Sequence, residues 1–80
     1  MPPWRLEPHG RTLRIDLVTW LEGSEWERLF DGITQEIASV DRVTFVVPQE
    51  GPATAQLLLE SFVEALQGRG LTVEVERRSG

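Results

Sequence analysis

Two segments far apart in the chain alternate strictly between apolar and polar residues, and they limit the fold more than any other feature. Every second position is apolar in each: Leu13, Ile15 and Leu17 in residues 12–18, and Leu71, Val73 and Val75 in residues 71–76. A period of two predicts β-strands with one face in the core and the other in water. A sheet made from such strands carries helices on one face only.

Two helices to cover this face are indicated by apolar stripes with helical spacing. The first is expected from Ser24, because Ser24-Glu25-Trp26-Glu27 has the sequence of a capping box. The second is expected to begin with Pro52 in its first turn and to end at Gly68 or Gly70. The stripes consist of Trp26, Leu29, Phe30, Ile33 and Ile37 in the first helix and of Ala55, Leu58, Leu59, Phe62 and Leu66 in the second.

The remaining segments complete the predicted topology. Residues 4–18 are expected to form a hairpin that turns at Pro8-His9-Gly10, and the β-branched run 43–47 a central strand. Right-handed crossovers with both helices on one face require strands in sequential order. We therefore predict an α/β two-layer sandwich, ββαβαβ, whose four-stranded mixed sheet has the order 1-2-3-4 with strand 1 antiparallel. It forms one domain over residues 1–80, with a frayed tail at 77–80.

Composition narrows the possible functions. The chain has thirteen acidic and eight basic residues, a net charge of −5, no cysteine and a single histidine, His9, and all its basic residues are arginine. Acidity disfavours nucleic-acid binding, while the missing cysteine and lysine exclude thiolate and Schiff-base chemistry. No apolar stretch is long enough to span a membrane. We expect a cytoplasmic protein that is not an enzyme and has no metal or cofactor.

The order and lengths of these segments resemble the STAS domain of anti-sigma-factor antagonists. The similar parts are residues 13–18 with Glu22-Gly23 and the helix at Ser24, the central strand 43–47, the helix 53–70, and Arg69-Gly70-Leu71-Thr72-Val73. That family carries Asp-Ser-Ser/Thr-Gly at the start of the second helix, with a hydroxyl that a partner kinase phosphorylates. Gly51-Pro52-Ala53-Thr54-Ala55 stands there in this chain. The resemblance, to a truncated member without the last helix, implies Thr54 as a phosphorylation site.

Candidate partner-binding residues lie in two loops that follow strands. Trp20, Leu21 and Glu22 lie in the first, where a tryptophan offers the large rigid area typical of interface hot spots. The alternative is that Trp20 folds back over the end of the helical layer. Glu50 and Thr54 flank the start of the second helix, where added phosphate would be favoured by the helix dipole.

Several functions remain open from the sequence. We expect a small protein–protein interaction module that acts in regulation and binds a protein partner that remains unidentified. The alternative is an acidic immunity or inhibitor protein that masks a basic partner. An enzyme or ligand-binding domain that uses the loops after the strands is a third reading. The open sheet face and the final edge strand are two surfaces through which a homodimer could form.

Overall fold

A computed structural model describes residues 2–78 of the chain. Its elements are β1 (Trp4–His9), β2 (Thr12–Leu17), α1 (Gly23–Ile33), the short 3-10 helix η1 (Glu36–Ala38), β3 (Arg42–Val47), α2 (Ala53–Gln67) and β4 (Thr72–Arg77). The strands form one sheet in the order β1-β2-β3-β4. β1 is antiparallel to β2, whereas β3 is parallel to both β2 and β4. The predicted four-stranded mixed sheet with two helices is confirmed.

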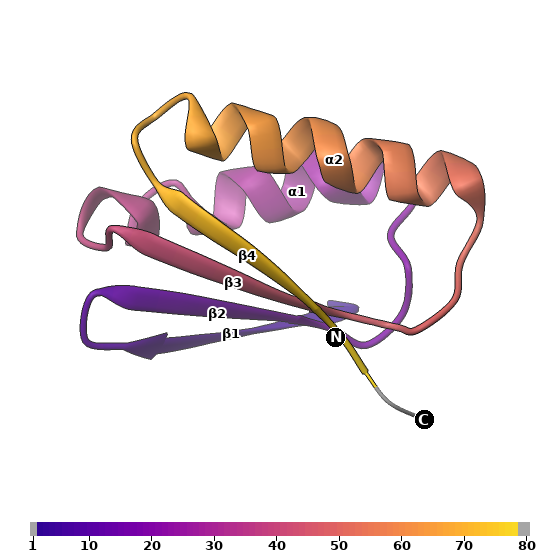
Figure 1. The fold of residues 1–80 in the computed structure, drawn as a ribbon, viewed down its shortest axis with the longest axis horizontal. Helices are drawn as coiled ribbons and strands as arrows, with labels where there is room; N and C mark the ends of the chain where they lie inside the picture. Colours follow the sequence, from indigo (N-terminus) through magenta and orange to yellow (C-terminus); the bar gives the residue numbers. More distant parts are fainter. Residues whose placement is uncertain (1, 79–80) are drawn as a thin grey trace.

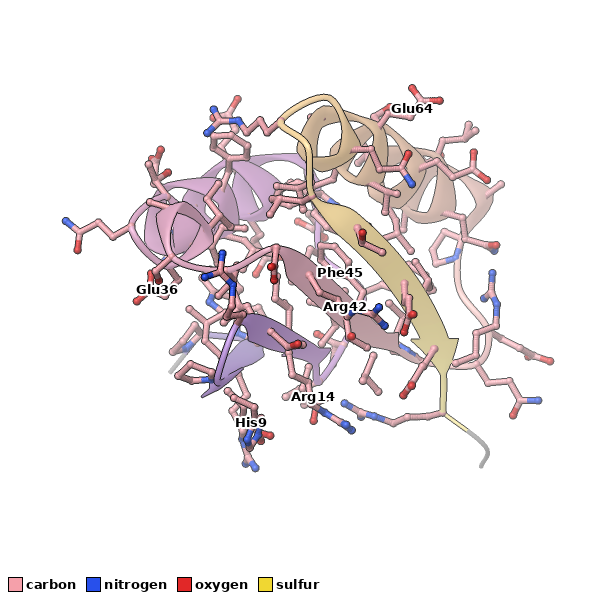
Figure 2. All side chains as sticks on the ribbon, turned by 60° about the vertical axis from the view of Figure 1, so that its left-hand side comes forward. His9, Arg14, Glu36, Arg42, Phe45 and Glu64 are labelled. Carbon is pink, nitrogen blue, oxygen red and sulfur yellow. The ribbon has the colours of Figure 1, made fainter. Side chains whose placement is uncertain are left out.

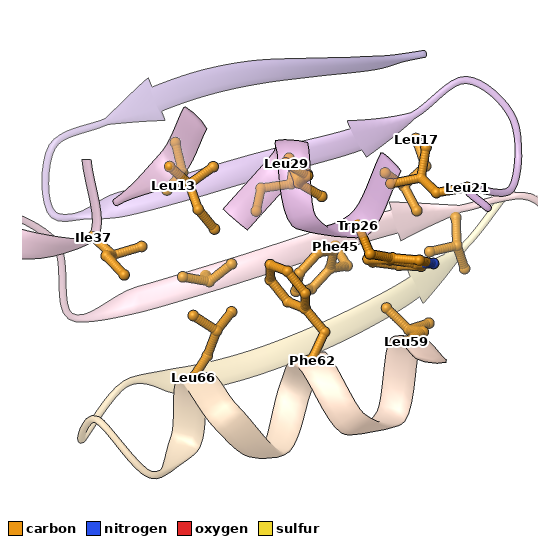
Figure 3. Packing of buried hydrophobic residues seen from close by; sticks show 14 of the residues in the cluster. Leu13, Leu17, Leu21, Trp26, Leu29, Ile37, Phe45, Leu59, Phe62 and Leu66 are labelled. Atoms are coloured by element: carbon orange, nitrogen blue, oxygen red, sulfur yellow. The ribbon is translucent and has the colours of Figure 1, made fainter. Parts of the chain in front are cut away.

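Both helices pack on the same side of the sheet (Figure 1). A cluster of buried apolar side chains fills the space between the layers, and it includes Ile15, Phe45 and Phe62 together. Phe62 of α2 lies at its centre, with ring centroids 5.4 Å from Trp26 and 5.6 Å from Phe45 (Figure 3). The alternation identified the core face of β2 correctly, because every second residue of that strand is fully buried. In β4 the alternating side chains are covered less well: Val73 is half-buried and Val75 is exposed.

The other face of the sheet carries cross-strand rows of charged and polar side chains, in which Val46 is a buried apolar member. One row runs Arg5–Asp16–Val46–Glu76 and the next runs Glu7–Arg14–Thr44–Glu74. Arg14 and Arg42 lie on this face, and Glu36 and Glu64 belong to the helical layer (Figure 2). With Arg42 and Arg78, the face holds four arginines and four carboxylates, so its formal charge is balanced.

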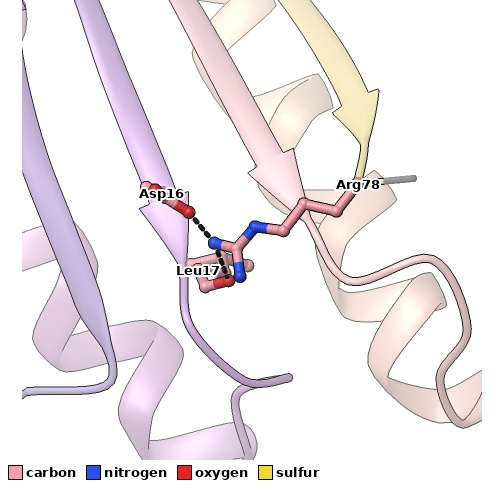
Figure 4. Close-up of polar contacts among 3 residues, drawn as sticks. All are labelled: Asp16, Leu17 and Arg78. Carbon is pink, nitrogen blue, oxygen red and sulfur yellow. Dashed lines mark hydrogen bonds and ion pairs between the residues drawn. The ribbon is translucent and has the colours of Figure 1, made fainter. Parts of the chain in front are cut away.

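Arg77 and Arg78 are the two residues of the predicted frayed tail (77–80) that the structure describes. Arg77 closes β4, and the Arg78 amide donates to Val47 O at 2.9 Å. The Arg78 guanidinium pairs with Asp16 and donates to Leu17 O at 2.8 Å, so that its side chain crosses the end of β3 (Figure 4). A backbone hydrogen bond therefore holds the main chain of Arg78, and charge-assisted hydrogen bonds hold its side chain. Residues 79–80 lie outside the described part of the chain.

The turn of the hairpin differs from the one that the sequence predicts. β1 continues through Pro8 to His9, which pairs with Thr12, so the turn consists of Gly10 and Arg11 rather than Pro8-His9-Gly10. Gly10 has a φ of 61° and no other residue of the turn has a positive φ, the pattern of a type II′ hairpin turn with glycine first. Pro8 is tolerated because β1 is an edge strand.

Candidate functional site

The candidate site lies where the loops after β2 and β3 meet. β2 and β3 are parallel, so their carboxyl ends share one edge of the sheet, and α1 and α2 both begin there (Figure 1). Sites in α/β folds form preferentially at this edge, because the loops and helix amino termini converge on it. We call it the carboxyl edge.

Trp20 joins the two loops. Its indole Nε1 donates to the backbone oxygen of Glu50 at 2.7 Å, and the ring lies directly over Gly51. A Cβ atom at Gly51 would lie 2.0 Å from that nitrogen, so glycine is what allows the ring to approach. Gln56 Nε2 donates to Gly51 O at 3.0 Å and holds the same loop from α2. Trp20 is half-buried, which combines both sequence interpretations: it packs inward and keeps part of its surface in water.

A hollow of about 330 Å³ lies beside the Trp20 ring. One wall is formed by the loop after β2 and the start of α1, with Trp20, Leu21, Glu22 and Gly23. The other wall is formed by the first turns of α2, with Pro52, Thr54, Ala55 and Leu58. Apolar atoms dominate the lining, and Glu22 and Thr54 supply its polar groups. Such a surface suits an apolar side chain of a partner better than a charged ligand.

The start of α1 differs from the predicted capping box at Ser24 and Glu27. Glu22 is the N-cap, and its backbone amide donates to Glu25 Oε1 at 3.0 Å. The helix starts two residues earlier because Gly23 and Ser24 both enter its first turn. With this start, the Glu25 carboxylate lies beside the free amides of the first turn and the positive end of the helix dipole, both of which favour a negative charge. The backbone amide of Glu22, beside the hollow, is therefore already hydrogen-bonded within the cap.

The structure brings four of the five predicted binding residues to one place. Trp20, Leu21, Glu22 and Thr54 all line the hollow, although Leu21 is only 2% exposed and contributes mainly to the core. Glu50 does not line it: its backbone oxygen holds Trp20 while the residue itself is exposed. Thr54 is exposed in the first turn of α2.

Sequence reasoning missed part of the site. The sequence pattern assigns Gly51 to a loop, and Ala55 and Leu58 to the apolar stripe of the second helix. The signal in the sequence was the small size of Gly51 and Ala55, because small residues leave room for the ring of a tryptophan that lies beside them in the fold. That signal could be found only after the two loops were known to be adjacent.

The described part of the chain has neither a metal-binding group nor a membrane-spanning helix. Within residues 2–78, no group of three or more histidine, aspartate or glutamate side chains is arranged to hold a metal ion. None of the helices in that range has the length and apolar content to cross a bilayer. Comparison with known proteins adds no further assignment, because no family model, curated protein or solved structure matches the chain.

Proposed function

We propose that this chain is a small cytoplasmic, non-enzymatic protein-binding module whose partner docks at the hollow on the carboxyl edge. The observation that carries the proposal is the convergence of Trp20, Leu21, Glu22 and Thr54 around one apolar hollow of about 330 Å³. Trp20 is the anchor, because a rigid indole beside an apolar depression offers both a surface and a pocket to a partner.

Regulation by phosphate at Thr54 is part of this proposal and rests on the resemblance to anti-sigma-factor antagonists. Thr54 is exposed at the second position of α2 and lines the hollow. A phosphate there would lie near the free amides of the helix amino terminus and would be favoured by its dipole. It would also place about two negative charges at the rim of an apolar docking surface, which opposes docking of an apolar group.

A second candidate function is supported by the distribution of charge. The open sheet face is balanced, so the other nine carboxylates lie on helices, loops and turns against only four arginines. The surface outside the sheet face therefore carries the whole net charge of −5. An acidic immunity or inhibitor protein that covers a basic partner would have this arrangement.

The experiment that tests the first proposal compares partner capture by wild type and by Thr54→Arg. Thr54 is exposed, so a long charged side chain blocks the hollow with little effect on the fold. Leu57→Arg is the matched control, because Leu57 lies on the same helix, is 62% exposed and does not line the hollow. We expect the wild-type protein and the Leu57→Arg variant to crosslink to the same partners, and the Thr54→Arg variant to lose them.

Identical partner lists for all three proteins would contradict docking at the hollow.

The dependence of binding on ionic strength distinguishes the acidic-inhibitor candidate from docking at the hollow. Its binding would weaken steeply as salt rises from 0.05 to about 0.5 M, because exposed charges are screened over about 8–10 Å at physiological salt. Docking of an apolar group in the hollow depends on salt only weakly.

A further inference from the structure

β4 has a strand neighbour on one side only. It is the last strand in the order β1-β2-β3-β4, and all of its ladder is made with β3. Thr72 N donates to Asp41 O and Arg78 N donates to Val47 O, so the amides of the even-numbered residues face β3. Backbone amides alternate along a strand, so those of Val73, Val75 and Arg77 point away from the sheet. An exposed row of this kind is a template for another strand.

A groove of about 320 Å³ runs along this edge between β4 and α2. Its apolar floor consists of Leu59, Val63 and Val75. Val75 belongs to the apolar face of β4, yet it is 42% exposed and is one of only three large apolar side chains exposed to that degree among residues 2–78. The groove therefore continues the apolar core outward to the unpaired edge.

Carboxylates flank the edge on both faces of the sheet. Glu60 and Glu64 line the groove on the helical side, and Glu74 and Glu76 lie on the open face of β4. Glu74 accepts from Arg42 Nη1 at 2.8 Å. The Arg77 guanidinium at the end of the groove points to Gln56 Oε1, 3.4 Å away. The charge along this edge is therefore predominantly negative.

We infer that the β4 edge is a second docking surface, which takes an extended segment of a partner protein with alternating apolar and basic side chains. Added as a strand, such a segment pairs with the outward backbone groups of Val73, Val75 and Arg77. Its apolar side chains lie in the groove, and its basic side chains face Glu74 and Glu76. This surface is separate from the hollow at Trp20 and does not depend on the function proposed for it.

Charge also argues against a second copy of this chain that pairs along the full length of β4. Antiparallel pairing of two β4 strands centred on Val75 would place Glu74 opposite Glu76 twice. Pairing centred on Glu74 would place that residue opposite its own copy. Like charges directly opposite in a ladder are destabilising. A basic segment forms favourable pairs at the same positions.

The test uses the whole chain and a fluorescent, end-capped peptide of alternating arginine and valine, about eight residues long. We expect saturable binding by fluorescence anisotropy, and about tenfold weaker binding to Val75→Pro. Proline at this position removes an outward amide and the Val75 side chain from the floor of the groove. The amides that face β3 are kept, so the ladder to β3 stays intact. Glu76→Arg is the second variant: it keeps every backbone amide, reverses one flanking charge, and should weaken binding several-fold.

Controls separate this surface from the hollow and from general charge. Leu57→Ala changes an exposed apolar residue away from the groove and should bind the peptide as wild type does. Trp20→Ala should also bind it unchanged, whatever happens to partner capture at the hollow. A peptide with glutamate in place of arginine should not bind.

Three results would overturn the inference. One is equal binding of the arginine and glutamate peptides. Another is unchanged affinity in both Val75→Pro and Glu76→Arg. The third is a wild-type dimer in sedimentation equilibrium that Val75→Pro converts to monomer, which would assign the edge to a second copy.

Discussion

Gly51→Ala should disturb the candidate site through a single contact. A Cβ atom at Gly51 would lie 2.0 Å from Trp20 Nε1 and 2.4 Å from two ring carbons, where ordinary contact begins at 3.4 Å. The ring must therefore move by about 1.4 Å. A shift of this size exceeds what the 2.7 Å bond from Trp20 Nε1 to Glu50 O can absorb.

The expected loss in the free energy of unfolding is the sum of two costs, and Gly23→Ala is the matched control. Loss of the hydrogen bond costs about 1 kcal/mol net. Loss of about 40 Å² of buried indole surface costs about 1 kcal/mol more at 25 cal/mol per Å². Replacing glycine by alanine also lowers the entropy of the unfolded chain, which stabilises by about 0.4–1 kcal/mol. Gly23→Ala has this last effect alone, because a Cβ at Gly23 has no atom within 4 Å.

The two variants should therefore differ by about 2 kcal/mol in the free energy of unfolding, with Gly51→Ala the less stable. For a domain of this size that is a difference of about 8–16 °C in Tm, measured by circular dichroism. In a Trp20→Ala background the contact is absent, so the difference should disappear. Equal stability of the two variants, or a difference that persists without Trp20, would refute the proposed role of this ring contact.

Two further predictions concern the core and the end of the chain. Phe62→Ala should destabilise by about 3–5 kcal/mol, because it opens a cavity among three aromatic rings, whereas Phe62→Leu should cost markedly less; urea unfolding measures both. Arg78→Ala should lower the free energy of unfolding by about 1 kcal/mol, because it removes the contacts to Asp16 and Leu17 O. Arg77→Ala should cost less than half of that, since its hydrogen bonds are 3.4 Å long; equal costs for the two arginines would contradict the bridging role of Arg78.

The layer arrangement could be predicted because each decisive signal was periodic. Alternation in residues 12–18 fixed which face of β2 is buried, and the stripe from Trp26 to Ile33 fixed the face of α1. Once both helices share a face, the handedness of crossovers leaves one strand order. These are properties of whole segments, so an error of one or two residues at an end does not change them.

Element ends were less predictable because they depend on competition between nearby groups. Ser24 and Glu22 are both candidate N-caps, and α1 begins after Glu22 because the Glu25 carboxylate then meets a backbone amide. Ile37 belongs to the predicted stripe and is buried, but it lies in η1 after the helix has ended at Ile33. The stripe shows which side chains are buried. It does not show whether the backbone between them remains an α-helix.

The binding surfaces could be predicted only in part. An alternating pattern shows which face of a strand is apolar, but not how completely the neighbouring helices cover that face. Helices pack about 8–10 Å apart, whereas the outer strands of a four-stranded sheet lie about 14 Å apart. Two helices therefore cover the middle of the sheet fully and each outer strand only in part. Phe45 on β3 is completely buried, while Val75, in register beside it on β4, is 42% exposed. The groove at the β4 edge follows from this difference in width, since a third helix would be needed to close it.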